Sequence, residues 1–170
     1  MSEVKNESPA TYSTQSSTKY LEDMTDDQII EVAKEILNRR MFSRIHTALE
    51  SVDTVKDFLH LHLAGELNEV FSAIWLDNQH CVIKVENLFF GSIDNSAVHA
   101  RQVVQSGLKY NAAAVIFAHN HPSGKTKPSR SDISITKKLA ETLDLFDIRV
   151  LDHFIVGREV TSMCELGITW

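Results

Sequence analysis

The spacing of apolar residues changes near Gly65, and this change separates a helical part of the chain from a part that contains strands. From Thr25 to about Arg40, apolar residues recur at helical spacing behind a Thr-x-x-Gln capping box, so we predict a helix there. A second helix is predicted from about Asp53 to Leu63, and Gly65 would end it.

The part of the chain after Gly65 alternates short apolar runs with longer helical patterns. The short runs predict strands at 69–76, 81–90, 112–119, 147–156 and 159–163. Helices are predicted at 96–109 and from Ser129, the second with an inner face of Ile133, Ile135, Leu139 and Leu143. The order strand, strand, helix, strand argues against a simple doubly wound parallel sheet. We therefore predict an α+β (mixed α/β) domain with a helical N-terminal extension.

Length and composition agree with one globular domain and an appendage. The chain has 170 residues, of which 43% are hydrophobic and 24% are charged. Residues 1–20 are polar and offer little apolar surface to bury, so we predict a disordered tail there. The helical N-terminal extension is predicted at 21–52 and the folded domain at 53–170.

Apolar content, cysteines and charge limit where the chain acts and what it binds. The N-terminus lacks the apolar stretch of a signal peptide and no run is long enough to cross a bilayer, so we expect a cytoplasmic protein without membrane association. Cys81 and Cys164, both expected in the core, fit a reducing compartment. The net charge of −6 does not favour nucleic acid as a partner, although it leaves room for a local basic patch. The pattern indicates no oligomeric state.

The segment with the most chemistry runs from His119 to Asp132. His119 and His121 are two residues apart at the end of a predicted strand, so their side chains point to one face. Pro122 and Gly124 allow the following loop to fold back and bring Asp132, in the first turn of the next helix, toward the two imidazoles. Two nitrogens and one oxygen leave a fourth position for water, which is typical of a catalytic zinc site.

Hydrolysis at such a site also needs a carboxylate that moves a proton and a donor for the developing oxyanion. Ser129, three residues before Asp132, is placed for the donor role. The two residues also form a Ser-x-x-Asp pattern that resembles a capping box. The alternative interpretation is therefore that Ser129 and Asp132 only cap the helix.

Several motifs together resemble the RadC family, a bacterial branch of the JAMM/MPN superfamily. Residues 119–124 read HNHPSG and are followed by Pro-Ser-x-x-Asp at 128–132, and further segments resemble the family pattern in order at 68–71, 91–93, 98–101, 111–114 and 152–153. The resemblance covers about residue 55 to the C-terminus. The run His-Ala-Arg-Gln at 99–102 departs from the family's usual Pro and Glu around the Arg. No helix-hairpin-helix pattern is visible near the N-terminus, so we expect a short form without that region.

The resemblance implies both a fold and an activity. The family fold is a β-sheet flanked by helices, similar to that of cytidine deaminases. The superfamily pattern of Glu, His-x-His, ten residues and Asp matches His119, His121 and Asp132 as zinc ligands and Glu69 as the base that activates the water. Glu66 is a nearby competitor for the role of the base. The implied activity is that of a zinc metallohydrolase that hydrolyses a peptide, isopeptide or other amide bond of an unknown substrate.

Two other functions stay open. RadC proteins carry a DNA-repair label, so the chain could be an accessory protein of DNA repair or recombination with no proteolytic role. A catalytically silent interaction module is the other alternative, and the intact ligand set argues against it. His153 also has two interpretations, as a partner of a metal ligand or as an ordinary hydrogen-bonded buried histidine.

Overall fold

The computed structural model describes residues 24–42, 51–91 and 98–170. Its centre is a mixed sheet with the strand order β2-β1-β3-β4-β5, in which only the β3–β4 pair is parallel. The strands are β1 (Val70–Leu76), β2 (Val82–Phe90), β3 (Ala114–Asn120), β4 (Arg149–Val156) and β5 (Val160–Ser162). The helices are α2 (Asp26–Phe42), α3 (Val52–Leu63), α4 (Ala100–Lys109) and α5 (Arg130–Asp144). The predicted α+β class, with a helix in the N-terminal extension, is confirmed.

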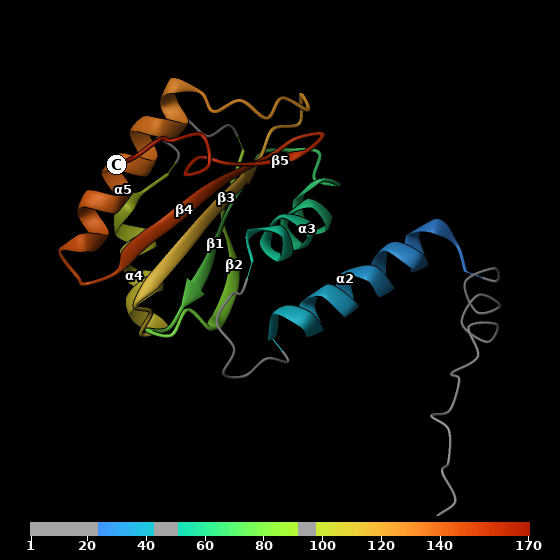
Figure 1. Cartoon of the computed structure of the whole chain (residues 1–170), viewed down its shortest axis with the longest axis horizontal. Helices are drawn as coiled ribbons and strands as arrows, with labels where there is room; N and C mark the ends of the chain where they lie inside the picture. The colour runs from blue at the N-terminus through green and yellow to red at the C-terminus, as the bar shows by residue number, and fades with distance from the viewer. Residues whose placement is uncertain (1–23, 43–50, 92–97) are drawn as a thin grey trace, which may run out of the picture.

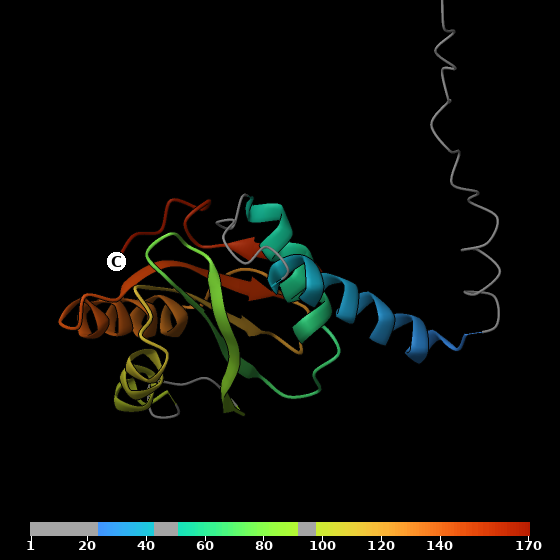
Figure 2. The same ribbon diagram turned by 90° about the horizontal axis from the view of Figure 1, so that it is seen from below.

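Helices cover both faces of the sheet. Figure 1 and Figure 2 show α3 on one face and α4 and α5 on the other, with α2 lying against α3. Successive residues of a strand point to opposite faces, so each strand contributes to two apolar clusters. In β1, Ile74 and Leu76 pack in the α3 cluster, whereas Phe71 and Trp75 pack in the α4–α5 cluster.

The same alternation decides where the chemistry of β3 lies. Val115 and Phe117 belong to the α4–α5 cluster, and Ile116 and Ala118 belong to the α3 cluster. His119 is the next residue in the alternation on the α5 side, and it has no exposed surface. The end of β3 therefore directs an imidazole into the space between the sheet and the start of α5.

Some details of the sequence prediction are wrong. Ile133 is 37% exposed and does not belong to the inner face of α5, because the buried stripe of that helix follows Asp132, Ile135, Thr136, Leu139 and Leu143. Cys164 is exposed, whereas Cys81 is buried as expected. The helix predicted from residue 96 begins at Ala100, after His99 in an extended conformation, and residues 96–97 lie outside the described part.

The structure tests the predicted domain boundaries and the expected lack of a membrane span only within the residues that it describes. The tail predicted at 1–20 lies outside the described residues, and the boundaries 21–52 and 53–170 stay predictions. Among the helices that the structure describes, none combines the length and the apolar character that a membrane span requires.

Candidate metal centre

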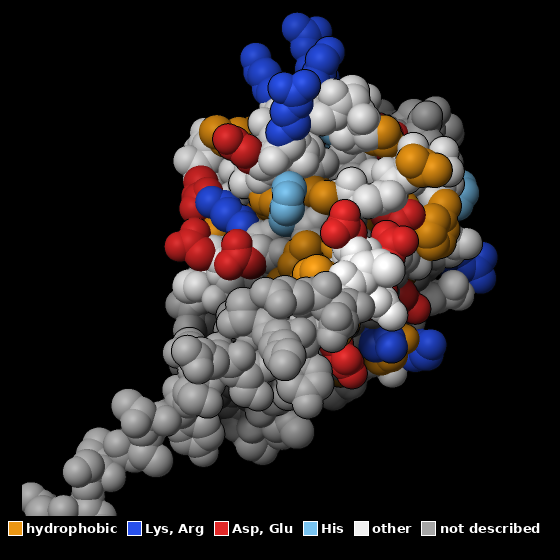
Figure 3. All heavy atoms as spheres, turned by 90° about the vertical axis from the view of Figure 1, so that its right-hand side faces the viewer, with side chains coloured by type: hydrophobic (Ala, Val, Ile, Leu, Met, Phe, Trp, Pro, Cys, Tyr) orange, Lys and Arg blue, Asp and Glu red, His pale blue; other side chains and the backbone are white. Residues whose placement is uncertain are grey.

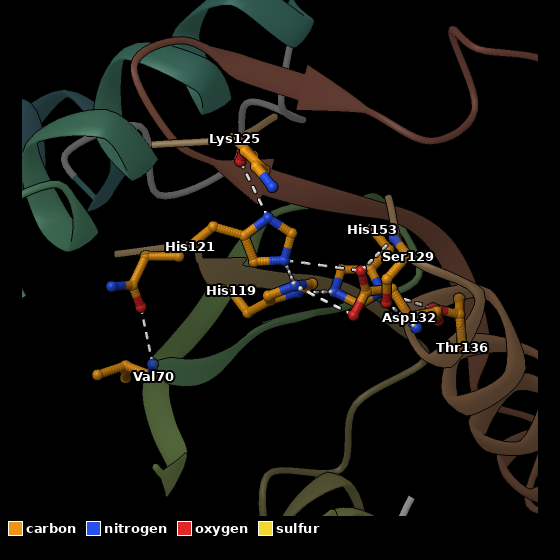
Figure 4. Close-up of polar contacts among 9 residues, drawn as sticks. Val70, His119, His121, Lys125, Ser129, Asp132, Thr136 and His153 are labelled. Carbon is orange, nitrogen blue, oxygen red and sulfur yellow. Dashed lines mark hydrogen bonds and ion pairs between the residues drawn. The ribbon is translucent and has the colours of Figure 1, made fainter. Parts of the chain in front are cut away.

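The end of a strand, the loop after it and the start of a helix bring His119, His121 and Asp132 together. His119 lies near the end of β3, His121 follows the strand directly, and Asp132 is in the first turn of α5. His119 and Asp132 are buried, and His121 is half-buried. Figure 4 shows the three side chains turned toward one another. The structure thus unites the residues that the sequence predicts as ligands.

The distances define a small cluster of nitrogen and oxygen atoms. Nε2 of His119 and Nε2 of His121 are 3.0 Å apart. Oδ1 of Asp132 is 3.3 Å from Nε2 of His119, and Oδ2 is 3.6 Å from Nε2 of His121. One ligand atom from each residue lies within 4.8 Å of the others, so the three could hold one metal ion.

A backbone carbonyl fixes the hydrogen of His121. Nδ1 of His121 is 2.9 Å from the carbonyl oxygen of Lys125. A carbonyl oxygen only accepts hydrogen bonds, so Nδ1 carries the hydrogen and donates it. In the neutral ring, Nε2 therefore carries a lone pair, and that lone pair faces His119 and Asp132.

A buried chain of hydrogen bonds fixes the hydrogen of His119 in the same way. The Thr136 hydroxyl is 2.6 Å from the carbonyl oxygen of Asp132 and 2.5 Å from Nδ1 of His153. Since the carbonyl only accepts, the single hydroxyl proton goes to it and His153 donates from Nδ1. Nε2 of His153 then accepts from Nδ1 of His119, at 2.8 Å. This leaves Nε2 of His119 with a lone pair.

Charge and burial set the protonation of the cluster. Hydrogen bonding to Asp132 is the main cause that raises the pKa of His121, burial opposes it, and the Lys125 carbonyl and the charges of Asp132 and Glu69 add to the rise. Burial acts against ionisation of Asp132, but the hydrogen bonds that both imidazoles donate when Nε2 is protonated, together with the bond from the Ser129 N–H, hold its pKa well below the ordinary range. Complete burial lowers the pKa of His153 well below that of a free imidazole, so His153 is neutral.

Glu69 lies at the edge of the centre, directly before β1. Its side chain is half-buried, and its charge contributes to the raised pKa of His121. Glu66 is exposed, and its charge is not among the causes of the raised pKa of His121. The electrostatic contact with His121 therefore favours Glu69 over Glu66 as the carboxylate next to the centre.

Asn120 was missed by the sequence analysis. It is buried, and its side chain accepts from the Val70 N–H at 2.7 Å and donates to the carbonyl oxygens of Glu66 and Asn68 at 3.2 and 2.9 Å. These three bonds tie the segment that carries Glu69 to the end of β3, which carries His119 and leads into His121. The available signal was an amide side chain between two histidines on a strand, where alternation turns it to the opposite face.

Ser129 begins α5, as the capping interpretation predicts. Its hydroxyl accepts from the Asp132 N–H at 3.1 Å, and its N–H donates to Oδ2 of Asp132 at 2.6 Å, which completes a capping box. Asp132 therefore caps the helix and faces the histidines at once. The side chain of Ser129 is exposed, and its role as an oxyanion donor stays a prediction.

Two glycines allow the β4–β5 turn to approach the loop that follows His121. A Cβ atom at Gly157 would lie 2.7 Å from the carbonyl oxygens of both Gly124 and Lys125. The N–H of Arg158 donates to the Gly124 carbonyl at 3.1 Å. The turn thus holds the backbone whose Lys125 carbonyl orients His121.

A groove of about 370 Å³ runs past His121 between this turn and the segment before β1, and Glu66, Leu67, Asn120 and Arg158 are among its lining residues. The turn and the loop after β3 lie at the top of Figure 1, near its middle, and Figure 3, which views the molecule from the right-hand side of Figure 1, shows Lys and Arg side chains standing out at the upper end. The exposed cations of these segments are Lys125, Lys127, Arg130 and Arg158. The segments around the groove thus carry four exposed cations, although Glu66 also lines the groove, Glu159 is exposed in the same turn and the chain carries a net charge of −6.

A mixed sheet between helices, with two imidazoles at a strand end and a carboxylate at the start of the next helix, is the arrangement of a JAB/MPN-type domain. A model of the RadC-like JAB domain matches residues 49–168. The chain belongs to the RadC family.

Relatives from several bacteria agree with this assignment. A UPF0758 protein of Pseudomonas fluorescens (strain Pf0-1) is 50% identical over 81% of this chain and 63% of its own length. A UPF0758 protein of Marinomonas is 45% identical over 82% of this chain and 62% of its own length, and one of Vibrio cholerae is 44% identical over 84% and 89%. The chain thus spans less than two thirds of the length of the first two of these relatives. The names of these relatives state no activity.

Proposed function

We propose that this protein is a zinc-dependent hydrolase of a peptide, isopeptide or other amide bond, with His119, His121 and Asp132 as the metal ligands. One observation carries the proposal. Both Nε2 atoms and the Asp132 carboxylate present electron pairs to one another across 3.0–3.6 Å, while the Nδ1 hydrogens are committed elsewhere. Such a cluster is stable only when a cation, either a proton or a metal ion, lies among the three groups.

The donor set fits a catalytic zinc site. Two imidazoles and one carboxylate satisfy three positions of a tetrahedral ion and leave the fourth for water or substrate. Zinc in such a site brings the pKa of water near neutrality and polarises the carbonyl of a substrate. The half-buried position of His121 beside the groove gives substrate access to this side of the cluster.

The chain's own residues supply the proton transfers and the binding of charge. Glu69 takes a proton from the attacking water and returns it to the leaving nitrogen. The Ser129 hydroxyl donates to the oxyanion that develops on the substrate carbonyl. Asn120 holds the segment of Glu69 in place, and the groove past His121 takes the chain on one side of the scissile bond.

The test begins with the metal content of the purified protein. We expect about one zinc per chain in the wild type and none in the His119→Ala/His121→Ala double variant, because both nitrogen ligands are lost. Elemental analysis should cover iron and manganese as well, since two histidines and a carboxylate also suit ferrous iron. A wild type that takes up no metal, even when zinc is supplied, would remove the proposal.

Glu69→Gln then separates metal binding from catalysis. We expect this variant to retain its zinc and to lose hydrolysis of any substrate found by a peptide and isopeptide screen, because an amide cannot accept the proton. Glu66→Gln is the matched control, since it changes an exposed carboxylate close by on the same segment. Full activity in Glu69→Gln with loss in Glu66→Gln would reverse the assignment of the base.

The four exposed cations on the segments around the groove are the observation that favours the alternative, a DNA-associated accessory protein with no proteolytic role. Lys125, Lys127, Arg130 and Arg158 are exposed, and none of them forms an ion pair with another described residue. Under this alternative, labelled DNA binds with an affinity that falls steeply with salt, and neutralising these four residues abolishes binding. Hydrolysis in the metal-loaded protein would then be absent.

A further inference from the structure

We propose that His153 and Thr136 are positioning residues that keep the hydrogen of His119 on Nδ1 and its Nε2 lone pair directed at the metal centre. The proposal rests on the metal centre of the proposed function, because it concerns the same three ligands. It assigns a role to two buried polar residues that contact the proposed ligands but contribute no ligand atom themselves.

The ring of His153 has a fixed orientation. It is completely buried, and its edge-to-face partners are Phe71 and Phe117, with centroid separations of 5.4 and 6.1 Å. One nitrogen of the ring faces Thr136 and the other faces His119. With both neighbouring phenyl rings in the core, the imidazole has no free space in which to turn over.

The hydrogen bonds run in one direction because they end at a carbonyl. The Asp132 carbonyl accepts from Thr136, Thr136 accepts from His153, and His153 accepts from His119. The chain thus starts at one metal ligand and returns to the backbone of another. It links β3, β4 and α5 in one closed network, which Figure 4 shows beside the three ligands.

Removal of the Thr136 hydroxyl would undo this order. His153 would lose the acceptor for its Nδ1 hydrogen, and its neutral ring could then carry the hydrogen on Nε2 and donate it to His119. His119 would have to accept on Nδ1 and carry its own hydrogen on Nε2. That hydrogen would occupy the direction from which the metal binds, so binding would require its removal.

The main experiment compares zinc affinities by chelator competition. We expect Thr136→Val to weaken zinc binding by about 10–100-fold, the usual effect of losing a partner behind a metal-bound histidine. Thr136→Ser keeps a hydroxyl and should restore the affinity to near the wild-type value. Thr142→Val is the matched control, because Thr142 makes the same bond to the carbonyl four residues earlier, at 2.7 Å, without contact to a histidine.

A second measurement reads the tautomer directly, in the metal-free protein and without any assay of activity. NMR of isotope-labelled histidine nitrogens, above the pH range in which imidazoles protonate, should show the hydrogen of His119 on Nδ1 in the wild type. Thr136→Val should shift it to Nε2 in part or completely.

The outcomes separate the two proposals. If the wild type carries the His119 hydrogen on Nε2, the inference is overturned, whether or not any variant folds. Equal zinc affinity in the wild type and a folded Thr136→Val variant would overturn it as well. A wild type that binds no zinc but shows the expected tautomer shift on Thr136→Val would remove the metal function and support the positioning of His119.

Discussion

The layer between the sheet and α4–α5 has an apolar end and a polar end, and different interactions stabilise the buried side chains at each end. At one end, Trp75 pairs with Val115 in the sheet and packs among apolar side chains. At the other end, Phe71 pairs with His119, and imidazoles, a hydroxyl and a carboxylate fill the space. The apolar end is stabilised by area removed from water, whereas the polar end depends on every donor meeting an acceptor.

The two ends also differ in whether their buried donors have hydrogen-bond acceptors. In the chain from His119 through His153 and Thr136 to the Asp132 carbonyl, every donor meets an acceptor. Among the described residues, the buried side-chain polar atom without a partner is Nε1 of Trp75, at the apolar end. An apolar environment tolerates one unpaired N–H at a cost, while a network of neutral imidazoles with one missing partner would rearrange its hydrogens.

The largest expected effect concerns the apolar end. Trp75→Ala should lower the free energy of unfolding by about 3–5 kcal/mol, because it leaves a large cavity in the core. Trp75→Phe is the control and should cost much less, since it fills most of the volume and removes the unpaired N–H. Chemical denaturation measures both. Zinc content per folded chain should not change, and a loss of zinc in Trp75→Phe would contradict the separation of the two ends.

A smaller effect is expected from Asn120→Ala, a change next to the polar end but on the opposite face of the sheet. The variant leaves the N–H of Val70 and the carbonyls of Glu66 and Asn68 without their side-chain partner, so we expect a loss of about 1–3 kcal/mol in the free energy of unfolding. Zinc content should stay near that of the wild type, because the Asn120 side chain points away from the centre, whereas hydrolysis should fall with the displaced Glu69. Thermal unfolding and metal analysis together test this prediction. A variant that loses its zinc would refute the view that Asn120 positions Glu69 and does not support the metal ligands.

The smallest effect sharpens the comparison through pH. The pKa of His121 lies above its ordinary value of 6.5, chiefly because of the hydrogen bond with Asp132. A proton and a metal ion compete for the same nitrogen, so zinc affinity should fall by about tenfold per pH unit once the pH drops below this raised pKa. The decline should therefore begin above pH 6.5, while Asp132, with its pKa well below the ordinary range, adds nothing there. Chelator competition across this range measures it, and a constant affinity down to pH 6 would refute the raised pKa.

The sequence could predict that His119, His121 and Asp132 come together because their geometry is local. Residues two apart on a strand share a face, and one loop separates His121 from the first turn of α5, so His119, His121 and Asp132 needed little knowledge of the fold. Glu69 came only from the family resemblance, because its approach to His121 depends on the pairing of β1 with β3.

For the same reason, the sequence left two interpretations of His153 open and gave no indication of Thr136. The contact of His153 with His119 depends on the parallel register of β3 and β4, in which Phe117 is paired with His153. The contact of His153 with Thr136 depends on how α5 is rotated about its axis. The sequence analysis did not predict this rotation correctly, since it placed the exposed Ile133 on the inner face of the helix. The network could be predicted only if both the β3–β4 register and the rotation of α5 were known to within one residue.

The close contact at Gly157 carries a consequence for variation in the sequence. No ligand atom comes from this position, and its role is to leave room for the Gly124 and Lys125 carbonyls. Any larger residue would push away the backbone that orients His121. In a library randomised at residue 157 and selected for zinc binding alone, glycine should therefore be recovered almost as strictly as His119 and His121 would be at their own positions. Mutational scanning would then identify as essential for the metal centre a position that has no side chain.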